Sequence, residues 1–194
     1  IEQHQNGLIY FTTQNGIYFY DGYKFDKLSI DSLKSNALLN VSLKNSSEIQ
    51  LSIRDEGIAN FNLKTKKYQF EKGLKFASAA DNFIITDKFA YLLTTQIRII
   101  IIDLTTGKIL PDEFKRKKDD INQAFCVFKT QDNKILVGRS DGLYDATDGT
   151  QKRLGVLKNA KINSITQAKD GKLLIGSSGK IIILNNYKIE NEIT

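Results

Sequence analysis

Several residue types are scarce in this chain of 194 residues, and each scarcity excludes a class of site. The single cysteine, Cys126, rules out a disulfide within the chain, and its apolar neighbours indicate a small buried side chain. The only histidine, His4, leaves no partner for a histidine-based triad or a multi-histidine metal site. No apolar stretch approaches the roughly 18 residues of a membrane-spanning helix. We therefore expect no catalytic histidine, no metal and no cofactor.

The charge of the chain is positive but scattered. Its formal net charge is +6, and its one basic run, Lys115 to Lys118, is followed at once by Asp119 and Asp120. A nucleic-acid surface would need a continuous basic stripe with interleaved aromatic residues. The run is typical of a solvated loop between structural units, so we expect no nucleic-acid partner.

A unit of about forty residues recurs five times along the chain. Its clearest copies begin at Gly7, Asp132 and Asp170, and degenerate copies run over 47–58 and 87–97. A large apolar residue stands three places before a small polar residue in each copy. These anchor residues are Tyr10, Leu51, Tyr91, Leu136 and Leu174. Such a period marks a repeat architecture in which each unit buries its apolar surface only against its neighbours, so we expect the anchors to be buried.

Within each unit the pattern is that of strands. Short β-branched or aromatic runs, such as 16–20 and 180–184, are bounded by turn dipeptides such as Asn15-Gly16 and Asp141-Gly142. Four antiparallel strands, A to D, in about forty residues form the blade of a β-propeller. The sequence therefore predicts an all-β fold of about five four-stranded blades, covering approximately residues 1–34, 35–76, 77–118, 119–158 and 159–194. Strand B of successive blades is predicted to begin near Leu8, Ile49, Phe89, Ile135 and Leu173.

One position in the repeat is a candidate for ligand binding. Alignment of the units places five residues at the end of strand B: Thr13, Arg54, Thr94, Arg139 and Ser177. In propellers this end faces the turn between strands B and C, near the mouth of the central channel, where equivalent positions converge. The guanidinium groups of Arg54 and Arg139 offer paired donors for an anionic ligand. The alternative is a surface salt bridge with Asp55, Glu56 or Asp141, and carboxylates at turns are otherwise interpreted as turn formers.

The opening segment resembles a known family. The stretch from Gly7 to Ile17 is similar to the blade pattern Gly-x-Leu-Trp-Ile-Gly-Thr-x-x-Gly-Leu of two-component regulator propellers. The first blade of that family often closes with Tyr-Asp-Gly-Tyr-x-Phe, as the chain does from Tyr20 to Phe25. The resemblance spans all five units and is strongest in the first, fourth and fifth. The chain departs from it at every tryptophan position, where it has tyrosine or leucine, and the middle units lack most of the Gly-Thr.

The resemblance implies a function. The family forms the periplasmic sensor region of hybrid histidine kinases in Bacteroidetes, which recognises breakdown products of complex polysaccharides and signals across the inner membrane. It implies a non-catalytic sensor whose partners are an oligosaccharide ligand and the remaining blades and kinase part of a longer protein. Two alternatives stay open: a propeller glycan hydrolase or lyase, which needs a cluster of ionisable groups at the channel mouth, and a structural module for dimerisation.

The number of blades raises the question of ring closure. The family resembles two seven-bladed propellers in tandem, so we interpret the chain as part of a larger ring, with a closed five-bladed ring as the alternative. An open array would expose unpaired strand edges, which are templates for pairing with another chain. An array that does not close is therefore expected to form a homodimer, joined near residues 1–10 or near residues 181–189.

Overall fold

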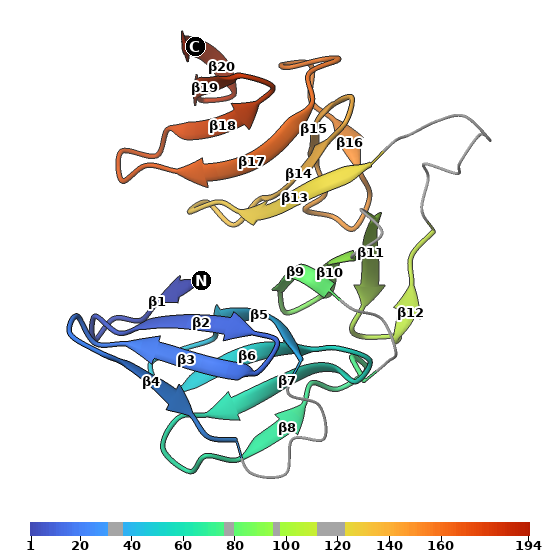
Figure 1. Ribbon diagram of the computed structural model, residues 1–194. Helices are drawn as coiled ribbons and strands as arrows, with labels where there is room; N and C mark the ends of the chain where they lie inside the picture. Colours follow the sequence, from blue (N-terminus) through green and yellow to red (C-terminus); the bar gives the residue numbers. More distant parts are fainter. Residues whose placement is uncertain (31–36, 76–79, 95–97, 112–122) are drawn as a thin grey trace. The chain divides into compact units, whose positions relative to one another are not determined.

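The computed structural model describes residues 1–30, 37–75, 80–94, 98–111 and 123–194, and every regular element among them is a β-strand (Figure 1). These strands form five four-stranded antiparallel sheets, each built from four consecutive strands. The predicted all-β fold of four-stranded blades is thereby confirmed. The described ranges hold no helix that is long and apolar enough to cross a membrane. The predicted blade boundaries near residues 34, 76 and 118, and the basic run at 115–118, lie outside the described residues.

The strands follow the chain in blade order. The first blade contains β1 (Glu2–Gln3), β2 (Ile9–Thr13), β3 (Gly16–Tyr20) and β4 (Phe25–Leu28), and the second contains β5 (Leu38–Leu43), β6 (Glu48–Ile53), β7 (Gly57–Asn62) and β8 (Tyr68–Phe70). The third contains β9 (Ala80–Ile85), β10 (Phe89–Thr94), β11 (Arg98–Asp103) and β12 (Lys108–Ile109). The fourth contains β13 (Ala124–Lys129), β14 (Ile135–Arg139), β15 (Gly142–Asp145) and β16 (Lys152–Arg153), and the fifth contains β17 (Ile162–Gln167), β18 (Leu173–Ser177), β19 (Lys180–Asn185) and β20 (Lys188–Ile193). Strand B of every blade begins within one residue of its predicted start.

Aspartates close several of the turns, as the sequence predicted. Between β3 and β4, Asp21 Oδ1 accepts hydrogen bonds from the backbone N–H groups of Tyr23 (2.8 Å) and Lys24 (2.9 Å). The same arrangement follows β11, where Asp103 Oδ1 accepts from Thr105 and Thr106. These backbone donors hold the pKa of both carboxyl groups below its usual value, because they stabilise the charged form. Such side chains replace backbone partners and so favour turns over continued strands.

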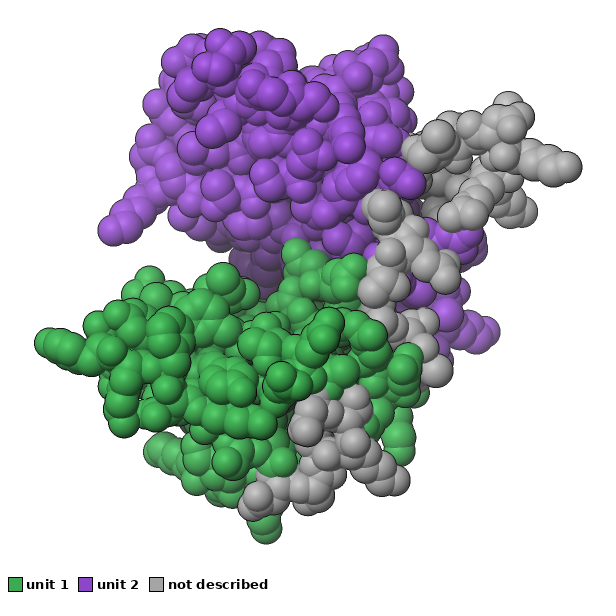
Figure 2. Space-filling model, in the orientation of Figure 1, with its two compact units in different colours: residues 1–83 green, residues 84–194 purple. Residues whose placement is uncertain are grey.

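The chain divides into two compact units, residues 1–83 and residues 84–194, which Figure 2 distinguishes by colour. In the first unit, the core lies between the first and second blades. The first blade contributes Tyr10, Ile17 and Leu28, and the second blade contributes Leu51 and Phe61, all of them buried. The two sheets therefore pack face to face, and each sheet shields the apolar surface of the other from solvent.

The second unit has two such cores. Between the third and fourth blades, Tyr91 and Ile101 pack against Val137 and Tyr144. Between the fourth and fifth blades, the buried residues include Cys126, Leu136 and Leu143 on one side and Ile162, Leu173, Ile175 and Ile182 on the other. The fourth blade therefore buries both of its faces within this unit.

The repeat alignment needs one correction in the second blade. Thr13 pairs with Gly16 across the two-residue turn of the first blade, whereas Ile53 pairs with Gly57 across a three-residue turn. Counting back from these pairs makes Gln50, and not Leu51, the structural equivalent of Tyr10. Leu51 is buried as expected, but it lies on the face that packs against the first blade.

The other anchors behave as predicted, with one exception. Tyr10, Tyr91 and Leu136 are buried on the face that covers the following blade. Leu174 occupies the same position in the fifth blade but is only half-buried. Its sheet face is the one opposite to Leu173 and Ile175, which pack against the fourth blade.

Candidate functional site

The candidate ligand positions lie at the turn between the second and third strands of each blade. Thr13, Thr94, Arg139 and Ser177 are the last residues of β2, β10, β14 and β18. Arg54 is not their equivalent, because β6 ends at Ile53 and Arg54 opens the longer turn of the second blade. The sequence alignment therefore placed Arg54 one residue too early in the repeat.

In the first unit the two candidates are exposed. Thr13 Oγ1 donates to the carbonyl of Gly16 (3.1 Å) and accepts from the N–H of Asn15 (3.1 Å), so its hydroxyl closes the turn. The backbone N–H of Arg54 donates to the carbonyl of Ala37 (3.0 Å), and its side chain is exposed. Among the described residues no ion pair joins Arg54 to a carboxylate, so the salt-bridge alternative does not apply to it there.

In the second unit Arg139 is buried, with only 3% of its surface exposed. Its Nη1 donates to Gln151 Oε1 (2.7 Å), and its guanidinium carbon lies 5.6 Å from the centre of the Tyr144 ring. A buried cation is costly unless polar or aromatic partners replace its water. These contacts tie the end of β14 to β15 and to the residue before β16, so the direct role of Arg139 is to hold the blade together.

A wider polar cluster surrounds this arginine. The Tyr144 hydroxyl donates to Asp141 Oδ2 (2.7 Å), and Nη2 of Arg153 lies 3.7 Å from the same oxygen. Arg153 also donates to the backbone carbonyl of Asp141 and to Asn159 Oδ1 (3.1 Å). The side chains of Asp141 and Arg153 are about one-third exposed, at 33% and 34%. We call the residues Arg139, Asp141, Tyr144, Gln151 and Arg153 the blade-four cluster.

The cluster presents donors and acceptors side by side. Asp141 Oδ1 is buried without a hydrogen-bond partner in the described part of the chain, while Oδ2 accepts from Tyr144. Burial, together with the hydrogen bond to the Asp141 carboxylate, raises the pKa of Tyr144 to about 12. Tyr144 therefore stays a neutral donor at physiological pH.

An alkaline titration tests these environments. Burial also raises the pKa of Tyr187 to about 12, and that of Tyr91 well above its usual value. Burial raises the pKa of Tyr10 as well, so four of the eight tyrosines, followed by ultraviolet absorbance, should ionise later than an ordinary phenol near pH 10. The folded state keeps these protons where the unfolded state loses them, so stability should fall as pH rises from about 10 to 12. Tyr144→Phe should remove one late phenol; all eight tyrosines ionising together in the folded protein would contradict the geometry.

The remaining two candidates, Thr94 and Ser177, are not members of the blade-four cluster. Thr94 is buried, and its Oγ1 has no hydrogen-bond partner in the ranges that the structure describes. Ser177 is half-buried at the end of β18, where it pairs with Ile162 and Lys180. Within the described ranges, Arg139 is therefore the one candidate of the five that belongs to the blade-four cluster.

Sequence reasoning did not single out three members of the cluster: Tyr144, Gln151 and Arg153. Asp141 was expected as a turn former and as a salt-bridge partner, and its carboxylate does face Arg153. Gln151 lies twelve residues beyond Arg139, and no periodic pattern marks that distance. Only the pairing of β14, β15 and β16 brings these side chains together.

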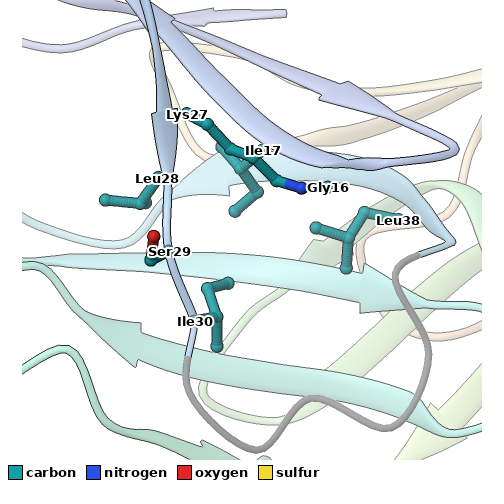
Figure 3. A pocket seen from close by; sticks show the side chains of 7 residues that line it. All are labelled: Gly16, Ile17, Lys27, Leu28, Ser29, Ile30 and Leu38. Atoms are coloured by element: carbon teal, nitrogen blue, oxygen red, sulfur yellow. The ribbon is translucent and has the colours of Figure 1, made fainter.

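A pocket of about 220 Å³ opens in the first unit, beside the same turn of the first blade (Figure 3). Most of its lining is aliphatic. The lining residues are Gly16, Ile17, Lys27, Leu28, Ser29, Ile30 and Leu38. Among the described residues that line it, Lys27 and Ser29 alone have polar side chains, whereas small-molecule sites usually combine an apolar wall with several convergent polar groups. Among the described residues no group of three or more histidine, cysteine, aspartate or glutamate side chains is placed to hold a metal ion.

The solved structures that resemble this chain include β-propeller proteins. The chain is similar to the extracellular domain of the hybrid two-component system BT4673 from B. thetaiotaomicron, with 19% identity over 98% of this chain and 26% of that one, and a TM-score of 0.69. The extracellular domain of BT3049 from the same organism matches at 19% identity over 95% of this chain and 28% of that one, with a TM-score of 0.66. The β-propeller domain of Cps50 (Swd1) from Myceliophteria thermophila matches at 13% identity, over 97% and 65% of the two chains, with a TM-score of 0.64.

These likenesses show the fold, which is that of β-propeller blades. The chain spans about a quarter of the length of the two extracellular domains. No protein-family model matches the sequence, and no curated protein matches it at the sequence level.

Proposed function

We propose that this chain is a non-catalytic, ligand-sensing part of a hybrid two-component regulator and that it acts in the periplasm. The observation that carries this proposal is the likeness, over 98% of the chain, to the extracellular domain of such a system. The remaining blades and a histidine kinase would belong to the same longer protein. Within each unit, blades that pack on one another suit this role, because they hold their own ligand-binding turns in fixed positions for a signal to be passed on.

We place the ligand at the turns between the second and third strands, and we propose that it is a glycan-derived oligosaccharide. In the second unit, Arg153 supplies donors and Asp141 supplies an acceptor, while the buried Tyr144 holds the Asp141 carboxylate in place. Sugar hydroxyl groups need both kinds of partner, and a uronic-acid carboxylate pairs well with a guanidinium group. In the first unit, the exposed Arg54 and Thr13 occupy the same end of their blades. Arg139 acts through Tyr144, as a positioning residue.

Binding measurements test the proposal. Isothermal titration of the purified chain with short neutral and uronic-acid oligosaccharides should detect binding of at least one acidic oligosaccharide. Arg153→Ala should weaken this binding by roughly tenfold or more, because a charge-assisted hydrogen bond is lost. Lys169→Ala removes an exposed cation from the turn between β17 and β18, at the opposite end of its sheet, and should leave the affinity unchanged.

The same mixtures separate a sensor from an enzyme. Mass analysis after long incubation should show every oligosaccharide intact. Cleavage that disappears on replacing a single aspartate or glutamate would instead support the hydrolase or lyase alternative. If none of the oligosaccharides binds, the proposal that the ligand is a glycan is wrong.

A further inference from the structure

A β-bulge recurs at the start of the first strand in the second, fourth and fifth blades. In each case one residue is left without a partner in the second strand, and these residues are Leu39, Phe125 and Asn163. A bulge re-aims the side chain of its extra residue, and bulges are frequent next to functional sites. Phe125 in β13 and Asn163 in β17 belong to neighbouring strands of the second unit (Figure 1). Two re-aimed side chains therefore lie on adjacent first strands of the same unit.

Phe125 packs in neither core of this unit. Ala124 lies in the core between the third and fourth blades, and Cys126 lies in the core between the fourth and fifth. Phe125 stands between them in the sequence, but neither core includes it, and its ring is only half-buried. The Nζ atom of Lys161 lies 4.5 Å from the centre of this ring, which is a cation–π contact. An aromatic ring that supports no core remains available for contact with a ligand.

The loop that leads into β17 fixes the position of Lys161. This loop, residues 154–161, connects β16 to β17, and Asn159 ties it to the blade-four cluster. The N–H of Asn159 donates to the carbonyl of Asp141 (2.7 Å), and its Oδ1 accepts from Arg153 (3.1 Å). Asn159 has φ +63°, a left-handed conformation that asparagine tolerates better than most residues. Lys161, two residues further on, is therefore held at the same end of the blade as the cluster.

Phe125, Lys161 and Asn163 offer three kinds of contact, and we call these three residues the bulge site. The face of an aromatic ring is electron-rich and attracts positively polarised groups, such as the C–H groups of a sugar. Lys161 is exposed, and among the described residues no carboxylate forms an ion pair with it, so its ammonium group can bind an anion. Asn163 is also exposed, and its amide supplies both donors and an acceptor for hydroxyl groups. This combination suits a sugar that carries a carboxylate.

We infer that the bulge site is a second subsite for the oligosaccharide and that it holds an acidic sugar unit. This inference rests on the proposed function, in which the ligand contacts Arg153 and Asp141 of the blade-four cluster. The backbones of the first and fourth strands of a blade are about 14 Å apart, because neighbouring strands are spaced by ~4.8 Å. A ligand that contacts both sites therefore contains more than one sugar unit. A longer acidic oligosaccharide should accordingly bind more tightly than a single uronic acid.

A single-tryptophan variant tests contact at the bulge site directly. The chain contains no tryptophan, so the tryptophan emission of Phe125→Trp comes from this position alone. Addition of an acidic oligosaccharide should change the emission along the saturation curve that isothermal titration gives. Phe25→Trp is the matched control, because Phe25 is 65% exposed at the start of β4, in the first unit and away from the turn between β2 and β3. Its emission should stay constant.

Two further substitutions separate the contribution of the ring from that of the charge. Phe125→Ala should weaken binding of the acidic oligosaccharide by roughly tenfold, because the contact with the ring is lost, and should leave the salt dependence of binding unchanged. Lys161→Ala should make binding less sensitive to salt, because it removes one charge that salt screens. Circular dichroism checks that the variants fold. If Phe125→Ala does not fold, the emission of Phe125→Trp decides alone.

The second subsite and the proposed function fail in different ways. If Arg153→Ala lowers the affinity, but Phe125→Ala does not and the emission of Phe125→Trp stays constant, the second subsite is wrong and the ligand remains at the blade-four cluster. If no oligosaccharide binds the wild-type chain, both are wrong. If Lys161→Ala leaves the salt dependence unchanged, the bulge site does not hold the acidic unit.

Discussion

Tyr91→Ala is expected to lower the free energy of unfolding by about 2–5 kcal/mol. The ring is fully buried between the third and fourth blades. Its hydroxyl donates to the carbonyl groups of Ala146 (2.8 Å) and Thr147 (3.2 Å), beyond the end of β15. The variant would leave a cavity and remove the donor of two carbonyl groups. Denaturant unfolding followed by far-ultraviolet circular dichroism measures the change.

Two further variants separate the contributions to this loss. Tyr91→Phe keeps the ring and removes only the hydroxyl, so it should cost about 1–3 kcal/mol. Tyr23→Ala removes a tyrosine that is 96% exposed and should change stability by less than about 0.5 kcal/mol. A loss below about 1 kcal/mol for Tyr91→Ala would show that this residue is not part of the core between the blades.

Gly57→Ala should be comparably disruptive in the first unit, at about 2–5 kcal/mol, because it combines backbone strain with overpacking. Gly57 has φ +122°, a conformation that side chains disfavour. An added Cβ would also lie 2.0 Å from the carbonyl oxygen of Leu74 and 2.9 Å from Cα of Lys75. That carbonyl accepts a hydrogen bond from the N–H of Ile58, so a shift would disturb the start of β7.

Gly171→Ala measures the cost of backbone strain without the cost of overpacking. Gly171 also has a positive φ, +87°, but in the described part of the chain no heavy atom other than those of its two chain neighbours lies within 4 Å of the position that its Cβ would take. Its replacement should cost only the strain of the conformation, about 1–2 kcal/mol. Equal losses for the two glycine variants, measured by the same denaturation, would mean that the close approach of Leu74 is not real.

The sequence was sufficient for the blades because their pattern is local. The second strands at Phe89, Ile135 and Leu173 begin where predicted, because an apolar run marks each of them, and the turn dipeptides Asp141-Gly142 and Asp170-Gly171 also bound the last two. The register of the second blade was missed for a physical reason. The residue equivalent to Tyr10 is Gln50, which is polar yet buried, so the search for a large apolar residue selected its neighbour Leu51. The extra residue in the turn between β6 and β7 leaves no mark in the sequence, because apolar and polar residues alternate on both sides of the turn.

The candidate site was less predictable than the fold. The sequence could place Arg139 at a strand end, but burial and partner choice depend on the neighbouring strands. Gln151 and Tyr144 reach its guanidinium group only after β14, β15 and β16 have paired. Arg54 shows the opposite case: it is exposed as a ligand contact requires, although the alignment that selected it was wrong by one residue. Whether the ring closes, and with how many blades, stays a prediction.

The two cores of the second unit have a consequence for how this unit unfolds. Among the described residues of this unit, the buried cores join only neighbouring blades, so the unit resembles a short linear chain of coupled blades, with the fourth blade in the middle. The third or the fifth blade can open while one core stays intact, whereas opening the fourth blade disrupts both cores together. Amide hydrogens of β14 should consequently exchange with solvent near the rate of global unfolding, and those of β20, whose residues are all exposed, much earlier.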